Sequence, residues 1–97
     1  MEKLFKLNNS HEAKALFGTH DENLKMMEKE LGVTIVTRGE SLKIEGQPKP
    51  VESSLRLLEE LALTVRSGGL LKKHEILYAI QVMKEDQTRD IHSIYLD

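Results

Sequence analysis

The pattern of apolar and polar residues is sharpest in the middle of the chain. Over residues 24–31 apolar side chains recur every three or four positions, which predicts an amphipathic helix, and Gly32 follows as a left-handed stop. Over residues 33–38 the period changes to two, and the alternation resumes over residues 42–44. The two alternating stretches therefore predict short strands that pair as an antiparallel hairpin around Gly39-Glu40.

Two further elements precede this unit. The mixed run KLFKL near the N-terminus fits a first strand of about five residues, and a short helix over residues 11–17 follows it. Asn9 and Glu12 have the spacing of a capping box, in which two side chains satisfy free backbone N–H groups at the start of a helix. Thr19 and Glu22 repeat this spacing, so we expect a second capping box at the start of the next helix.

Two helices follow the hairpin. The widest apolar stripe of the chain covers residues 50–67, and Pro50 suits the first position of a helix because its missing N–H has no intrahelical partner there. After Gly68-Gly69, the apolar spacing over residues 73–85 predicts a last helix. A small apolar cluster without an evident partner lies near the C-terminus, at Ile91, Ile94, Tyr95 and Leu96. We therefore expect the chain to be part of a longer protein.

The predicted order of elements is strand, helix, helix, strand, strand, helix, with one helix appended. An antiparallel three-stranded sheet with helices on one face buries all of these stripes, so the sequence predicts a two-layer α+β fold. We assign residues 1–67 to the α/β module and residues 68–97 to the appended helix and tail.

Composition and charge say little about the fold, but they limit the possible functions. The 97 residues suffice for one domain, and 39% hydrophobic with 31% charged residues is ordinary for a folded protein. The formal net charge of -2 supplies no general attraction to nucleic acid, so such a partner would need a local basic patch. No apolar run resembles a signal peptide or a membrane span, and cysteine is absent. We therefore expect a cytoplasmic protein with no membrane partner.

The sequence offers no pattern for catalysis or metal binding. The four histidines are scattered without helical spacing, and no cysteine is present to complete a metal site. His20 and Asp21 are adjacent, but adjacent helix residues point in different directions, and nothing resembles a nucleophile or an oxyanion hole. We expect this chain to be no enzyme and to hold no metal or cofactor.

The order of elements, with a glycine loop between the first two helices, resembles the type I KH fold of RNA-binding proteins. The matching pieces are Gly18, the helix over residues 24–31, Gly32-Val33-Thr34-Ile35-Val36, Lys43-Ile44-Glu45-Gly46 and Val51-Glu52. In a KH module two glycines let RNA phosphates approach backbone N–H groups at a helix N-terminus, where the helix dipole favours an anion. Here Asp21 stands at the second glycine, and its carboxylate repels phosphate. The resemblance therefore implies weak binding of single-stranded RNA.

A closer resemblance, over nearly the whole chain, is to the N-terminal domain of PhoH-like proteins, the phosphate-starvation-inducible ATPases of bacteria. It rests on Phe17-Gly18-x-x-Asp21-Glu22-Asn23-Leu24 in register with Leu31-Gly32-Val33, continued by Gly68-Gly69 and Ala79-Ile80. In that family a P-loop ATPase domain follows, but no G-x-x-x-x-G-K-[ST] motif occurs here. The resemblance implies that ATP and Mg²⁺ belong to an ATPase half outside this chain, and that this half is one of its partners.

The resemblance and the charges together define a candidate RNA-binding groove beside the hairpin. Its residues are Gly18, Thr19, His20, Lys25, Thr34, Val36, Arg38 and Lys43. The three cations would form a rim, and Thr34 and Val36 the floor. The alternative interpretation is that the cations are solvated and paired with neighbouring glutamates, and that residues 18–22 only cap a helix. No aromatic residue is present in this stretch for a base to stack on.

Two functions of different classes remain open on the sequence. The first is a KH-like single-stranded RNA-binding accessory domain of a PhoH-like ATPase. The second is a protein-interaction or homo-oligomerisation module of the same ATPase that does not bind RNA. In the second case the helix over residues 73–85 or the apolar tail would make the contact.

Overall fold

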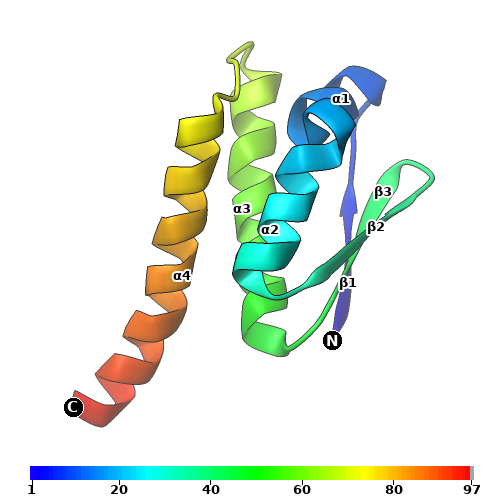
Figure 1. Ribbon diagram of the computed structural model, residues 1–97. Helices are drawn as coiled ribbons and strands as arrows, with labels where there is room; N and C mark the ends of the chain where they lie inside the picture. Colours follow the sequence, from blue (N-terminus) through cyan, green and yellow to red (C-terminus); the bar gives the residue numbers. More distant parts are fainter. Residues whose placement is uncertain (97) are drawn as a thin grey trace.

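The computed structural model describes residues 1–96, and the side chains of residues 1–85. The elements are β1 (Glu2–Lys6), α1 (Ser10–Phe17), the 3-10 turn η1 (Thr19–Asp21), α2 (Glu22–Leu31), β2 (Thr34–Arg38), β3 (Ser41–Glu45), α3 (Pro48–Arg66) and α4 (Lys73–Leu96) (Figure 1). The longer elements follow the β-α-α-β-β-α order of the type I KH fold, and α4 comes after them, as the sequence predicts.

The three strands form one antiparallel sheet in the order β1-β3-β2. β2 pairs with β3 with Ile35 opposite Ile44, so the predicted hairpin is confirmed. β1 pairs along the other side of β3, with Phe5 opposite Leu42. β3 is therefore the central strand, and β2 lies at an edge of the sheet.

The sheet has one covered face and one open face. Because successive side chains of a strand point to opposite faces, Phe5, Ile35, Leu42 and Ile44 share a side and are buried against the helices. Leu4 lies on the other side and is 66% exposed. Helices on one side of an antiparallel sheet make the two-layer α+β fold, which confirms the predicted class (Figure 1).

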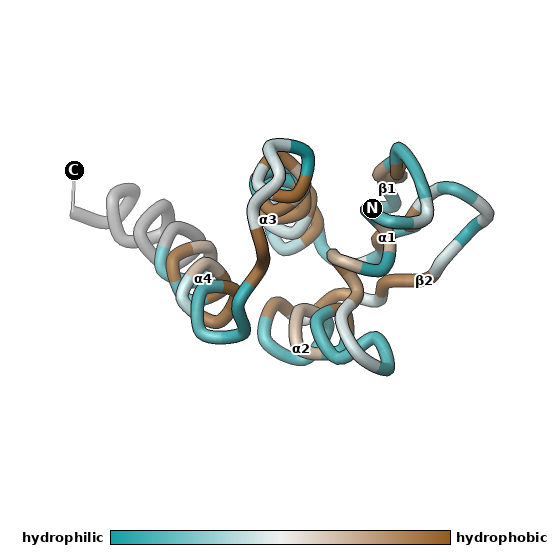
Figure 2. The backbone as a smooth tube through the Cα atoms, turned by 90° about the horizontal axis from the view of Figure 1, so that it is seen from above, coloured by the Kyte–Doolittle hydropathy of each residue, from teal (hydrophilic) through white to brown (hydrophobic). Residues whose placement is uncertain are grey.

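Helix α4 packs against α2 and α3, on the side away from the sheet (Figure 2). Its Ile76, Ile80 and Met83 are buried in the same apolar cluster as the residues beneath the sheet. Lys84 Nζ also lies 3.0 Å from Glu30 Oε2 of α2. The helix added to the KH-like order is thus part of the same core. The side chains of the apolar tail at 91–96 lie outside the described residues.

Some helix ends differ from the expected ones. Helix α3 begins at Pro48 rather than Pro50, since both prolines fit in a first turn that needs no backbone donor. Helix α4 continues to Leu96 instead of ending near residue 85. At α1 the first capping box is half confirmed: Asn9 Oδ1 accepts from Glu12 N at 2.9 Å, but the Glu12 carboxylate accepts from the N–H of Asn8.

Candidate nucleic-acid interface

The loop between α1 and α2 contains a left-handed turn. His20 has φ 53° and Asp21 has φ 58°, whereas Glu22 returns to the right-handed region at φ -60°. The N–H of Asp21 donates to Gly18 O at 3.3 Å and closes the turn. Helix α2 therefore starts at Glu22, with Asp21 as its N-cap and no side-chain capping bond. The predicted capping box of Thr19 and Glu22 is wrong, because the left-handed residues separate Thr19 from the helix.

Gly18 is required by its backbone and by its surroundings. Its φ of 77° and ψ of -176° lie in a region that is essentially restricted to glycine. A Cβ at this position would also lie 2.8 Å from Asn23 Nδ2. Asn23 is 5% exposed, and its Nδ2 donates to Leu16 O at 3.1 Å, which ties the first turn of α2 to the end of α1. The role of Asn23 was not evident from the sequence, where it is one letter of the FGxxDENL block.

A groove lies between α2 and the edge strand β2. Its volume is about 240 Å³, and its lining residues are Asp21, Leu24, Lys25, Glu28, Ile35, Val36 and Thr37. One side of the groove is fixed by a hydrogen bond, since Glu28 Oε2 accepts from the N–H of Ile35 at 2.9 Å. The Gly18 loop reaches this groove through Asp21, the residue at which the loop enters α2.

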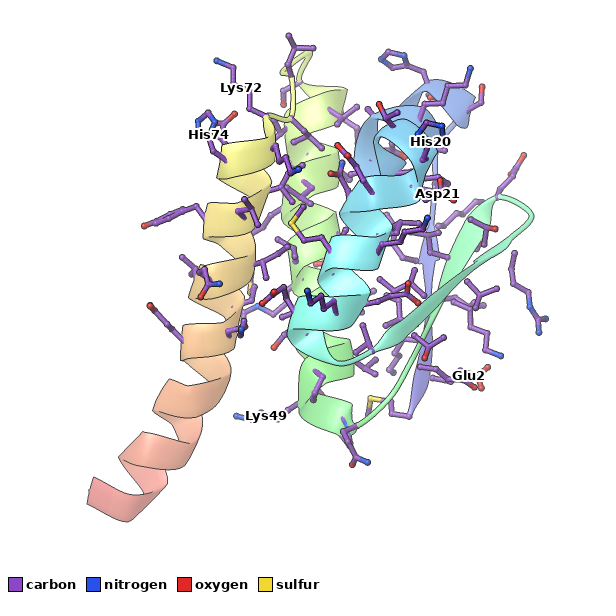
Figure 3. All side chains as sticks on the ribbon, in the orientation of Figure 1. Glu2, His20, Asp21, Lys49, Lys72 and His74 are labelled. Atoms are coloured by element: carbon purple, nitrogen blue, oxygen red, sulfur yellow. The ribbon has the colours of Figure 1, made fainter. Side chains whose placement is uncertain are left out.

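The charges around the groove are mixed. Lys25 is exposed and lines it, but Asp21 and Glu28 place two carboxylates in the same lining. Within residues 1–85 the Asp21 carboxylate has no hydrogen bond or ion pair, and Figure 3 shows it beside His20 at the N-terminal end of α2. The groove therefore has a cation at its side and an uncompensated anion at its loop end.

The structure brings some of the predicted site residues together and separates others. Lys25 and Val36 both line the groove, and Gly18, Thr19 and His20 form the loop that leads to it. Thr34 and Arg38 are exposed at the two ends of β2. Lys43 lies on the central strand, where its Nζ is 3.6 Å from carboxylate oxygens of both Glu2 and Glu45. Lys43 thus forms ion pairs with two glutamates on the open face of the sheet and is not among the residues that line the groove.

An ion pair between a buried carboxylate and an exposed guanidinium joins α1, which leads into the loop, to α3. Glu12 of α1 is 2% exposed, and Arg66 of α3 donates to its carboxylate through Nε and Nη2. Burial raises the pKa of Glu12, but hydrogen bonds from Arg66 and the N–H of Asn8, with the charge of Arg66, hold that pKa below its usual value. The two residues are 54 positions apart, so no local pattern signals the pair.

A second cavity, of about 370 Å³, lies between the start of α1 and the hairpin turn and is lined by Leu7, Asn9, Ser10, Ala13, Gly39 and Glu40. Its charged lining residue is Glu40, and unlike the groove it has no cation among its described lining residues, so it is less suited to a polyanion. Among the described residues no group of three or more histidine, aspartate or glutamate side chains is placed to hold a metal ion. Over the same part of the chain, no helix is both long enough and apolar enough to cross a membrane.

The element order, the sheet order and the glycine loop that opens onto a groove at the sheet edge define a KH-like α+β module. No protein-family model matches the chain. It is 37% identical over 90 residues to a PhoH-like protein of Bacillus subtilis (strain 168), a match that covers 93% of this chain and 28% of that protein. The chain is therefore homologous to a segment of PhoH-like proteins and spans little more than a quarter of the length of this relative.

Two further comparisons agree with this assignment. A PhoH-like protein of Mycobacterium tuberculosis (strain ATCC 25618 / H37Rv) is 29% identical over 68 residues, covering 70% of this chain and 19% of that protein. The crystal structure of a protein of unknown function from Aeropyrum pernix has a TM-score of 0.72 at 12% identity, covering 99% of this chain and 53% of that one. The first match confirms the predicted resemblance to PhoH-like proteins. The second concerns the fold alone.

Proposed function

We propose that this chain is a KH-like domain that binds single-stranded RNA for a PhoH-like ATP-binding protein, with the RNA bases in the groove between α2 and β2. The observation that carries the proposal is the groove itself. Its lining includes Leu24, Ile35 and Val36, a cation, Lys25, and the two carboxylates described above, and the glycine loop lies at its end. An open groove with a cation at its side can receive an extended polyanion.

The backbone of the loop favours an anion at the same end of the groove. The N–H of Glu22, the first of α2, donates to Thr19 O, but the N–H groups that follow it in the first turn have no intrahelical acceptor, and the helix dipole adds a partial positive charge there. The Asp21 carboxylate opposes this attraction, so few phosphate contacts are made. We expect a dissociation constant on the order of 10–100 μM, in the range of weak electrostatic binding.

Fluorescence anisotropy with a short 5′-labelled RNA tests the proposal. Binding should weaken as salt rises, because phosphate contacts release counterions. Lys25→Glu should weaken binding about tenfold, since it replaces an attraction by a repulsion at the groove. Lys29→Glu is the matched control: it makes the same charge change on an exposed residue of the same helix that does not line the groove. If no RNA binds at high micromolar protein, or if both variants weaken binding equally, the proposal fails.

A second candidate function is supported by a different surface. On α4, Tyr78 is 73% exposed and Leu77 is 40% exposed, so this helix presents apolar area to solvent. The same domain would then serve as a protein-interaction or oligomerisation module of the PhoH-like protein. Light scattering over a range of protein concentrations tests self-association, and a constant monomeric mass would count against it.

A further inference from the structure

The open face of the sheet carries three rows of side chains that cross the strands. Residues that pair on neighbouring antiparallel strands point to the same face, so each row takes one residue from β1, one from β3 and one from β2. The acidic row is Glu2, Glu45 and Thr34, the middle row is Leu4, Lys43 and Val36, and the basic row is Lys6, Ser41 and Arg38. The charge of this face therefore changes sign along the strands.

The two charged rows are well separated within one molecule. Glu2 and Glu45 are exposed at one end of the strands, and Figure 3 shows Glu2 pointing away from the helices. Lys6 and Arg38 are exposed at the other end, and neither forms an ion pair with any side chain of residues 1–85. The rows are four residues apart along a strand, or about 13 Å, which exceeds the Debye length of about 10 Å at 0.1 M salt. Each row can therefore attract an opposite charge from outside.

The middle row is apolar at both sides and neutralised at its centre. Leu4 is 66% exposed and Val36 is 45% exposed, with Lys43 between them on β3. Lys43 Nζ lies 3.6 Å from a carboxylate oxygen of Glu2 and of Glu45, so this ammonium group leans toward the acidic row. The centre of the face is thus left to two apolar side chains, whose transfer out of water is favourable.

We propose that this open face binds the same face of a second copy of the chain, about a two-fold axis that runs along the middle row. Such an axis sets the acidic row of each copy against the basic row of the other, and it sets Leu4 against Leu4 and Val36 against Val36. The lean of Lys43 toward its own glutamates keeps the two ammonium groups from meeting at the axis. The dimer does not depend on RNA binding.

A second copy fits this face better than a nucleic acid does, because a polyanion would be attracted by the basic row and repelled by the acidic row. The face is small, however. Three strands about 4.8 Å apart and five residues long cover roughly 15 by 17 Å, below the area of about 800 Å² per partner in a stable complex. We therefore expect a weak dimer, with a dissociation constant of about 0.1–1 mM at low salt.

Sedimentation velocity of the 97-residue chain, at up to about 1 mM protein, tests the proposal. The unaltered protein should dimerise in about 0.05 M salt and at least about tenfold more weakly in about 0.5 M salt, which screens the charged rows. Lys6→Glu with Arg38→Glu makes both rows acidic, and Glu2→Lys with Glu45→Lys makes both rows basic. Each double variant alone should dimerise about tenfold more weakly, because like charges then meet. An equal mixture of the two should dimerise at least as tightly as the unaltered protein.

The control is Lys29→Glu with Lys72→Glu, the same charge change on exposed residues outside the open face. This control should still dimerise, and its mixture with the basic variant should associate less than the mixture of the two face variants. Tyr78→Ser, on the exposed side of α4, should leave the dimer unchanged. Circular dichroism checks that each variant folds. A monomer at the highest concentration in low salt, mixed face variants that fail to associate, or loss of the dimer in Tyr78→Ser overturns the inference, and none of these results bears on RNA binding.

Discussion

Replacing Asp21 by glycine and, separately, by alanine distinguishes the two effects of this residue on the loop. Both variants remove the carboxylate that lines the loop end of the groove. Only the alanine variant keeps a Cβ at a position where the backbone has φ 58° and ψ 26°. The difference between them in stability therefore measures the cost of the left-handed backbone, and their shared effect on RNA binding measures the charge.

The magnitudes follow from the backbone and from Coulomb's law. A side chain in the left-handed region costs roughly 1–2 kcal/mol, and the smaller freedom of alanine in the unfolded chain offsets about 0.5–1 kcal/mol of this. Asp21→Gly should therefore be about 1 kcal/mol more stable than Asp21→Ala. A phosphate at about 6 Å from the carboxylate is repelled by roughly 0.7 kcal/mol in water, so both variants should bind RNA about threefold more tightly at low salt.

The assays are urea unfolding for stability and fluorescence anisotropy for RNA affinity. Glu22 is a matched control position, because it follows directly in the chain but has φ -60° and ψ -33°. There the order should reverse, with the alanine variant about 1 kcal/mol more stable than the glycine variant. If Asp21→Ala is also more stable than Asp21→Gly, the result contradicts a left-handed backbone at position 21. If neither Asp21 variant binds RNA more tightly, the loop end of the groove does not face phosphate.

Three further predictions concern the residues that hold the loop in place. Gly18→Ala should lower stability by about 1–3 kcal/mol in urea unfolding, because of its glycine-only backbone and the close approach of Asn23; unchanged stability would contradict this geometry. Asn23→Ala should lower stability by about 1–2 kcal/mol in the same assay, since the hydrogen bond from the side-chain amide to Leu16 O is lost. Asn23→Asp should lower it more, because a carboxylate would face that carbonyl oxygen, and an unchanged stability in either variant would contradict the bond. Arg66→Met should cost about 2–3 kcal/mol at neutral pH and less in acid. Because the pKa of Glu12 is lowered in the folded protein, the pair contributes stability above the unfolded-state pKa of Glu12, and this stability is lost as pH falls through the folded-state pKa. The urea unfolding curves of the unaltered protein and of Arg66→Met should therefore converge in acid.

The parts of the fold that were predictable depend on local periodicity. The stop at Gly32 and the change to a period of two give the helix, the hairpin and their order, because each signal lies within a few neighbouring residues. The loop was less predictable. The sequence Thr19 to Glu22 fits a capping box. The left-handed backbone of His20 and Asp21 could not be predicted, because it leaves no trace in the pattern of apolar and polar residues.

The site was predictable where it depends on one element and not where it depends on contacts between elements. Lys25 and Val36 were placed in the groove by their helix and strand alone. Lys43, predicted at the rim, lies on the central strand β3 beside Glu2 and Glu45, and the contact with Glu2 follows only once β1 pairs with β3. The bond from Ile35 to Glu28 and the ion pair of Glu12 likewise join segments that the sequence does not relate.

The packing of α4 determines where this chain can be shortened. Burial of Ile76, Ile80 and Met83 contributes about 1.5–3 kcal/mol each, which together is comparable to the whole folding free energy of a domain of this length. A protein truncated at Ser67 would keep every element of the KH-like order but expose the sides of α2 and α3 to water. Expression of an isolated, soluble domain for binding experiments should therefore retain α4, although none of its residues with described side chains, 73–85, lines the groove.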